Sequence, residues 1–337
     1  MRILYVAMAY EYGRPELGPS FEEMNFRSAL DGMGHDVHPF DFRARRDAVG
    51  ERQMARELVA LAAEVEPDLA FFFLFEDEIS PATIRAVGDA GGCPTMNWFA
   101  DDHWRFEGFT RRYAPALDWS ITTDREALPK YRRLGVDQVV LSQWAVNRYA
   151  YCRTAEKIEH GVSFVGLPHG NRREVIAGLT RAGYDVECWG DGWPKGRIDH
   201  AAMVHLFGAS AINLNLSNSS SPSRTLRFRL GALARGRWGD VRRARARPSQ
   251  IKGRTFEVPG SGGFLLTEAV PHLDEYFVPG REVGVFASSD DLVEQVDYWL
   301  AHPSERAAVA EAGHRRALAE HTYDHRFAAI FSAAGLA

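Results

Sequence analysis

The chain has 337 residues, of which 45% are hydrophobic and 25% charged, and its formal net charge is −5. This composition is typical of a soluble globular protein, and the length favours two domains. No apolar run reaches the ~18–20 residues that span a bilayer, so we expect no transmembrane segment. The three cysteines, Cys93, Cys152 and Cys188, are far apart and lack a C-x-x-C spacing. This pattern favours a reducing compartment and predicts neither disulfides nor a zinc site. The N-terminus is a poor signal peptide, so we expect a cytoplasmic protein.

The first half of the chain alternates buried strands with helix-length segments. The run "RILYVAM" predicts a strand, and Ser20 to Glu23 predict a helix that opens with a capping box. Further strands are predicted at "DVHPFDF", "DLAFFFLF", "PTMNWFA", "LDWSITT" and "QVVLSQ", with helices that include 52–65 and 81–90. Strands separated by helices in this way indicate a parallel, doubly wound sheet.

The alternation breaks near 145–160 and then restarts. Strands are predicted at "VSFVG", "DVECWG", "AINLNL", "GFLLTE" and "VGVF", with helices over 171–182, 200–208, 289–301 and 303–320. We therefore predict an α/β fold with two facing Rossmann-like domains, 1–150 and 151–320, and a helix in 321–337 that packs back toward the first domain. Ligands of such sheets bind at the carboxyl ends of the strands, so the active cleft is expected between the domains.

Several longer stretches carry a resemblance to a known family. They are "R-x-F-E-V-P-x-x-G-G-F-L-L-T-E" at 254–268, "YFVPGREV" at 276–283, "HPSERAAVAEAGHRRALAEHTYDHRF" at 302–327, "SFVGLPHGNRREVI" at 163–176, "NWFADDHWRF" at 97–106 and "LSQWAVNRYAY" at 141–151. With them the chain resembles the GT-B glycosyltransferases of the family 1/family 4 superfamily, and more narrowly the CgeB-like family. The resemblance spans nearly the whole chain. It implies the GT-B fold and transfer of a sugar from a UDP- or GDP-type nucleotide sugar, and it leans toward retention of configuration.

The donor site is predicted within "KGRTFEVPGSGG". Sugar transfer develops negative charge on a departing diphosphate, which either a metal or fixed cations and backbone N–H groups must stabilise. The sequence has no Asp-x-Asp pair and no Cys/His cluster, so we predict a metal-independent site without a cofactor. The resemblance implies that Glu257 accepts hydrogen bonds from the ribose hydroxyls, for which a carboxylate is suited. The other candidates for donor binding are Lys252, Arg254, Gly262, Gly263, Arg172, His169 and Gly190. The alternatives are a solvent-exposed helix acid for Glu257, a solvated basic turn for Lys252 and Arg254, and plain turns for the glycines.

The acceptor side is predicted in the first domain. Asp101, Asp102 and His103 follow the strand "PTMNWFA" and are candidates for acceptor activation. The alternative is that one of the two aspartates caps the following helix. Three further candidates lie in the loop after the first strand: Tyr10, Glu11 and Arg14.

The segment 222–250 is rich in arginine. Residues 222–254 hold ten arginines, one lysine and one acid, so the rest of the chain carries about −15. Such a segment suits an anionic partner, as a lid over the diphosphate or as a nucleic-acid or membrane contact, and it also suits a solvated surface helix. The leading hypothesis is a metal-independent glycosyltransferase with an unidentified small-molecule or glycan acceptor. The alternatives are a GT-B sugar-nucleotide epimerase and a non-catalytic nucleotide- or nucleic-acid-binding protein.

Overall fold

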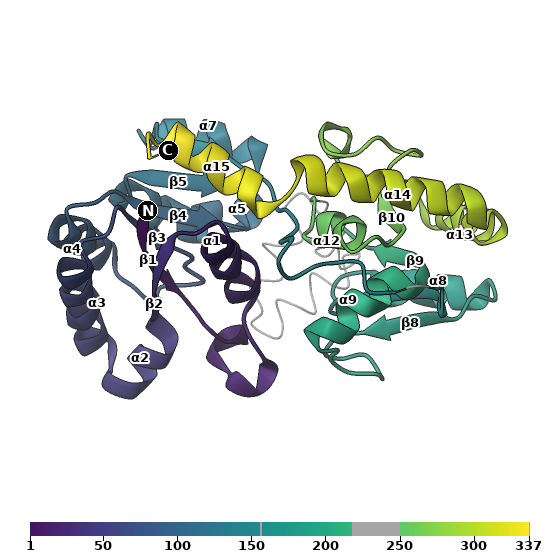
Figure 1. The fold of residues 1–337 in the computed structure, drawn as a ribbon, viewed down its shortest axis with the longest axis horizontal. Helices are drawn as coiled ribbons and strands as arrows, with labels where there is room; N and C mark the ends of the chain where they lie inside the picture. The colour runs from purple at the N-terminus through teal and green to yellow at the C-terminus, as the bar shows by residue number, and fades with distance from the viewer. Residues whose placement is uncertain (156, 218–249, 337) are drawn as a thin grey trace, which may run out of the picture. The chain divides into compact units, whose positions relative to one another are not determined.

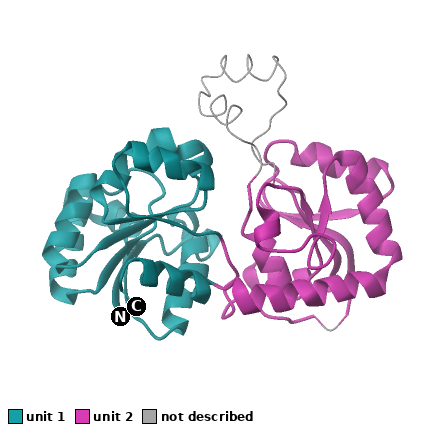
Figure 2. Ribbon diagram, turned by 90° about the horizontal axis from the view of Figure 1, so that it is seen from above, with its two compact units in different colours: residues 1–143, 323–337 teal, residues 144–322 magenta. Residues whose placement is uncertain are grey.

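The computed structural model describes residues 1–155, 157–217 and 250–336 and divides the chain into two compact units (Figures 1 and 2). Unit 1 consists of Met1–Gln143 and Tyr323–Ala337, and unit 2 of Trp144–Thr322. Each unit is a parallel sheet covered by helices, so the predicted α/β fold with two doubly wound sheets is confirmed. Most of the arginine-rich segment 222–250 lies outside the described residues.

The sheet of unit 1 has six parallel strands in the order β2-β1-β3-β4-β5-β6. Its central strands are apolar on both faces, as expected where helices cover both sides of a parallel sheet. Every residue of β3 and β4 is buried, which explains the continuous apolar run of β3, and β4 also buries the polar residues Thr95 and Asn97. The strands are β1 (Arg2–Ala7), β2 (Asp36–Asp41), β3 (Leu69–Phe72), β4 (Thr95–Phe99), β5 (Trp119–Thr122) and β6 (Val139–Leu141).

Two α-helices of unit 1 begin at residues whose side chains accept hydrogen bonds from their first backbone N–H groups. The Asp41 carboxylate caps α2, and the Ser80 hydroxyl caps α4. The helical segment after β1 opens at Ser20, whose hydroxyl accepts from the Glu23 N–H at 3.0 Å. The helices are α1 (Ser28–Gly32), α2 (Phe42–Val49), α3 (Glu51–Val65), α4 (Pro81–Gly91), α5 (Asp102–Arg105), α6 (Arg111–Tyr113) and α7 (Leu128–Arg133), with π-helical turns η3 (Glu23–Arg27) and η4 (Phe106–Thr110).

The predicted capping box is only half formed. The Glu23 side chain pairs with Arg27 at 2.5 Å instead of reaching back to the Ser20 N–H. That N–H donates to the carbonyl of Ala9 at 2.9 Å, which closes the loop after β1. The ion pair and the loop closure therefore replace the second half of the motif.

The last helix, α15 (Tyr323–Ala333), belongs to unit 1 although unit 2 precedes it in the chain. Its Phe327 ring meets the rings of Phe26 and Phe71 edge-on, each at 5.7 Å between centroids. Trp98 of β4 lies in the same aromatic cluster, 4.8 Å from Phe26 between centroids. Such aromatic contacts add to the apolar burial that holds α15 in place.

The sheet of unit 2 has five parallel strands in the order β11-β10-β9-β7-β8. The helices bury Leu, Ile, Val and Trp side chains against it. The strands are β7 (His160–Val165), β8 (Val186–Trp189), β9 (Ser210–Asn215), β10 (Leu265–Glu268) and β11 (Gly284–Phe286). The helices are α8 (Arg172–Arg181), α9 (His200–Ala209), α12 (Arg254–Gly260), α13 (Ser289–Ala301) and α14 (Pro303–Glu320).

Candidate functional site

Charged side chains gather at the carboxyl edge of the unit 2 sheet, where ligands of parallel sheets bind. Arg172 opens α8 after β7, Arg254 opens α12, and Glu268 ends β10. Burial and the charge of Arg254 lower the pKa of Arg172 to about 10, while Glu268 acts in the opposite direction. The three groups therefore interact electrostatically, although 82 residues separate Arg172 from Arg254 in the sequence.

Glu257 lies on α12 and is a second acid next to this group. Its side chain is 0% exposed, so the solvent-exposed helix acid considered as an alternative is excluded. Its Oε2 atom pairs with the Arg254 guanidinium, three residues earlier on α12. Its Oε1 atom is buried and has no hydrogen-bond partner among the residues that the structure describes. An unpaired buried carboxylate oxygen costs free energy that a ligand hydroxyl would recover.

Arg254 is held between the acid and an aromatic ring. Its guanidinium carbon lies 5.4 Å from the centre of the Phe207 ring of α9. Burial lowers its pKa, and its Nε atom is buried without a partner in the described part of the chain. The solvated basic turn is therefore excluded for Arg254, which keeps a donor available for an anionic ligand.

Arg172 ties two loops of unit 2 together. Its two terminal nitrogens donate to the carbonyls of Leu167 at 2.8 Å and Leu216 at 2.9 Å, and its guanidinium lies over the Phe164 ring. These bonds join the loop after β7 to the end of β9. The contacts favour a structural role for Arg172, whereas His169 on the same loop is exposed and Lys252 is half-buried.

The predicted glycines are explained by close packing within unit 2. Gly190 and Gly262 have φ angles of +135° and +80°, which favour glycine. A Cβ atom on Gly262 would lie 2.5 Å from the Arg153 Nε, and one on Gly263 would lie 2.2 Å from the Phe207 carbonyl oxygen. These positions therefore require glycine even without a ligand.

Asp102 is buried in unit 1, with 1% of its surface exposed. Its carboxylate accepts hydrogen bonds from the hydroxyls of Thr110 at 2.5 Å, Thr122 at 2.6 Å and Tyr131 at 2.7 Å. Burial raises its pKa to about 6 against the effect of these three donors. A carboxylate so fully engaged by its own unit favours a structural role over acceptor activation.

Asp101 and His103 lie beside this buried carboxylate. Asp101 stands at the start of α5, but its side chain makes no capping hydrogen bond, and Asp102 bonds only to hydroxyls. The expected capping of α5 by one of the two aspartates is therefore wrong. The His103 Nδ1 lies 4.0 Å from the Asp101 Oδ1, and 10% of the histidine side chain is exposed. This pair remains a candidate for acceptor contact.

The loop after β1 folds back on itself at the carboxyl edge of the unit 1 sheet. Tyr10 pairs with Pro19 in an antiparallel bridge, and the Glu11 N–H donates to the Gly18 carbonyl at 3.0 Å. Arg14 forms an exposed ion pair with Glu16 at 3.0 Å within the loop. Tyr10 is exposed and Glu11 is half-buried.

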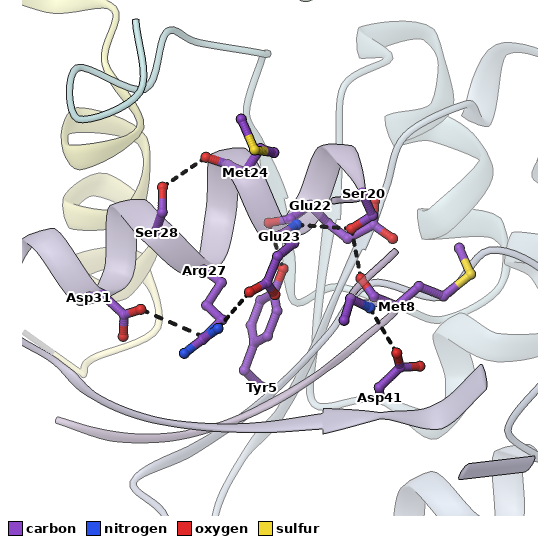
Figure 3. Close-up of polar contacts among 11 residues, drawn as sticks. Tyr5, Met8, Ser20, Glu22, Glu23, Met24, Arg27, Ser28, Asp31 and Asp41 are labelled. Carbon is purple, nitrogen blue, oxygen red and sulfur yellow. Dashed lines mark hydrogen bonds and ion pairs between the residues drawn. The ribbon is translucent and has the colours of Figure 1, made fainter. Parts of the chain in front are cut away.

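Glu22, which sequence reasoning treated only as part of a capping box, is a buried carboxyl directly after this loop. Figure 3 shows its surroundings, where the Tyr5 hydroxyl donates to the Glu22 carbonyl at 2.9 Å. Burial raises the pKa of Glu22 to about 8, with smaller contributions from Glu11 and Glu23. The feature of the sequence that could have indicated this residue is that Glu22 is an acid in the first turn of the helix that follows the first strand.

In residues 1–155, 157–217 and 250–336, no group of three His, Cys, Asp or Glu side chains is arranged to hold a metal ion. Within the same ranges, no helix is both long and apolar enough to cross a bilayer.

Comparisons with known proteins agree with this fold. Residues 172–332 match the sequence model of a family described as glycosyl transferase-like. Among solved structures, HepE from Anabaena in complex with UDP and glucose is similar over 98% of both chains, with a TM-score of 0.61 and 12% identity. Sucrose-phosphate synthase from Thermosynechococcus elongatus covers 99% of this chain and 98% of its own, with a TM-score of 0.61 and 12% identity.

A glycosyltransferase of avilamycin A biosynthesis covers 99% of this chain and 98% of its own, with a TM-score of 0.56 and 14% identity. No curated protein matches the chain in sequence. The chain therefore has the GT-B fold of these solved structures, and residues 172–332 are similar to the glycosyl transferase-like family.

Proposed function

We propose that this protein transfers a sugar from a nucleotide sugar, of the uridine diphosphate type, to a hydroxyl of an acceptor. The observation that supports this most is the buried Glu257 with its unpaired Oε1 atom next to Arg254. The similar Anabaena protein was solved with UDP, with UDP and glucose, and with UDP-glucose, which supports a uridine nucleotide. The proposal includes action in the cytoplasm and a CgeB-like relationship.

Different residues of unit 2 bind the ribose and the diphosphate of the donor. Glu257 accepts hydrogen bonds from the ribose hydroxyls through its free oxygen, and Arg254 faces the diphosphate, with Lys252 as a second cation. As the bond from the anomeric carbon to the diphosphate breaks, these cations stabilise the developing charge. We propose that no metal takes part, because fixed cations supply this charge, and that the configuration is retained.

Calorimetric titration of the full chain with UDP, GDP and inorganic diphosphate tests the proposal. We expect UDP to bind, and Glu257→Ala to weaken UDP at least tenfold because hydrogen bonds to a charged acceptor contribute ~1.5–3 kcal/mol each. Diphosphate, which has no ribose, should bind Glu257→Ala nearly as well as the parent, whereas Arg254→Ala should weaken both ligands.

Glu311→Ala is the matched control, because Glu311 is a helix acid of the same unit that pairs with Arg153 at 2.7 Å on the surface. It should bind UDP as the parent does. A folded Glu257→Ala variant with parental UDP affinity would contradict the donor-site assignment.

A further inference from the structure

Glu22 is a buried acid of unit 1 that the donor site leaves unexplained. Only 4% of its surface is exposed, and its Oε1 atom is buried without a hydrogen-bond partner in the described chain. Leaving a buried polar atom unpaired costs about 1–3 kcal/mol, so native proteins keep few such atoms, and each calls for an explanation. The carboxyl of Glu22 is therefore a candidate for contact with a ligand.

Three other acids near the carboxyl ends of the unit 1 strands have hydrogen-bond or ion-pair partners within the fold. Asp102 accepts three hydroxyls, as described above. Glu23, the next residue in the chain, pairs with Arg27, and Asp41 accepts from the Ala9 N–H at 3.1 Å (Figure 3). Glu22 differs from them because its carboxyl is buried and its Oε1 atom has no partner among the residues that the structure describes.

Two backbone irregularities lie next to Glu22. The π-helical turn Glu23–Arg27 follows it directly, and such turns occur frequently at functional sites. In the loop after β1, Tyr12 has a left-handed backbone with φ +52°, which costs a residue with a side chain of order 1 kcal/mol or more. Both irregularities lie at the carboxyl end of β1, the edge of the sheet at which ligands bind in this class of fold.

The charges around Glu22 select the kind of ligand. Glu11 and Glu23 both add negative charge near its carboxyl. Arg27 is engaged by Glu23 at 2.5 Å and by Asp31 at 3.6 Å, so its charge is already matched. An anionic ligand would be repelled at this position. With a pKa of about 8 the Glu22 carboxyl is mostly protonated at neutral pH, and it then offers one donor and one acceptor.

We propose that Glu22 binds a hydroxyl group of the acceptor, and that this acceptor is an uncharged polyhydroxylated molecule such as a sugar ring. The inference rests on the proposed glycosyl transfer and adds to it the acceptor class and a binding residue in unit 1. A carboxyl that donates and accepts one hydrogen bond matches a pair of neighbouring hydroxyls. The nearby carboxylates disfavour phosphorylated acceptors.

In the transfer step the acceptor oxygen bonds to the anomeric carbon while the bond from that carbon to the diphosphate breaks. The hydroxyl proton passes to the departing phosphate oxygen. Glu22 takes no proton in this step. Its part is to hold a second hydroxyl of the same acceptor, which fixes the orientation of the reacting one.

The test measures thermal shifts of the full chain at pH 7 with four neutral probes: methyl α-glucoside, methyl α-galactoside, methyl α-mannoside and myo-inositol. Glucose 6-phosphate and mannose 6-phosphate are the anionic probes. The variants are Glu22→Leu, which replaces the carboxyl with an apolar side chain of similar size, and Glu22→Gln, which keeps one donor and one acceptor. Glu23→Gln is the matched control, because its carboxyl lies on the same helical segment but pairs with Arg27.

We expect at least one neutral probe to raise the melting temperature of the parent and of Glu23→Gln, and to bind Glu22→Leu at least tenfold more weakly. Glu22→Gln should keep most of the shift, and the phosphorylated probes should produce smaller shifts than neutral ones. The proposal is overturned if no neutral probe stabilises the parent, if Glu22→Leu responds as the parent does, or if the phosphorylated probes bind better.

A separate titration with UDP distinguishes this inference from the proposed function. UDP should stabilise the parent and all three variants equally, because its proposed contacts lie in unit 2. If UDP stabilises all of them while the neutral probes fail, only the role of Glu22 is refuted. If UDP binds none of them, the donor assignment fails instead.

Discussion

Asp102 offers a quantitative test of whether an acid at the carboxyl edge of unit 1 supports the fold or acts on the acceptor. Replacing it with alanine leaves the hydroxyls of Thr110, Thr122 and Tyr131 without their common acceptor. Each orphaned buried hydroxyl costs ~1–3 kcal/mol, and the Thr122 oxygen still accepts from the Asp124 N–H at 3.2 Å. We therefore expect Asp102→Ala to lower the free energy of unfolding by about 3–6 kcal/mol.

The pH dependence gives a second measurement of the same group. Burial raises the pKa of Asp102 from its ordinary value of 3.8 to about 6, so the folded protein favours the protonated form. Relative to Asp102→Asn, the stability from this group is fully present below pH 3.8 and is lost as the pH rises through 6. The difference between a pKa of 3.8 in the unfolded protein and about 6 in the folded protein corresponds to about 3 kcal/mol of stability.

Denaturant unfolding of the parent, Asp102→Asn and Asp102→Ala between pH 4 and pH 8 measures both effects. Asp101→Asn is the control, because Asp101 is partly exposed and makes none of the three hydroxyl bonds. Its stability should change by less than about 0.5 kcal/mol. The reasoning is refuted if Asp102→Ala unfolds like the parent while its turnover falls ~100-fold, since the carboxyl would then act on the acceptor.

Three further predictions concern unit 2 and the chemistry. Arg172→Met should lower the free energy of unfolding by about 3 kcal/mol, because two hydrogen bonds from a charged donor are lost, while the UDP dissociation constant in calorimetry changes less than threefold. Gly263→Ala should destabilise unit 2 by at least 1–3 kcal/mol in urea unfolding, because its Cβ would overlap the Phe207 carbonyl, and parental stability would contradict this packing. Turnover of the donor should survive excess chelator, and activity restored only by magnesium or manganese would disprove metal independence.

The sequence was sufficient to predict the fold because helix and strand periods differ strongly in this chain. A continuous apolar run such as that of β3 is typical of a strand buried on both faces. The capping box at Ser20 was predicted from its spacing, but Glu23 pairs with Arg27 instead. Two favourable uses of one side chain compete, and the sequence alone does not decide between them.

The site was harder to predict because the type of a residue does not show whether its polar atoms already have hydrogen-bond partners in the fold. Asp102 and Glu22 both follow a strand and both open a helical segment. Three hydroxyls donate to the Asp102 carboxylate, whereas the Oε1 atom of Glu22 has no partner in the described part of the chain. The partners of Asp102 come from 8 to 29 residues further along the chain, so they become visible only in three dimensions. Gly263 likewise reads as a ligand-binding glycine until the Phe207 carbonyl is seen against it.

The return of the chain to unit 1 in α15 restricts how this protein can be divided into fragments. A fragment that ends before Tyr323 keeps all six strands of unit 1 but uncovers the aromatic cluster around Phe26, against which Phe327 packs. The family-matched segment 172–332 omits β7 and takes most of α15 away from its unit, so it would not fold as an independent domain. An exchange of unit 2 between relatives therefore requires residues 144–322 to be moved as an internal insert with two junctions.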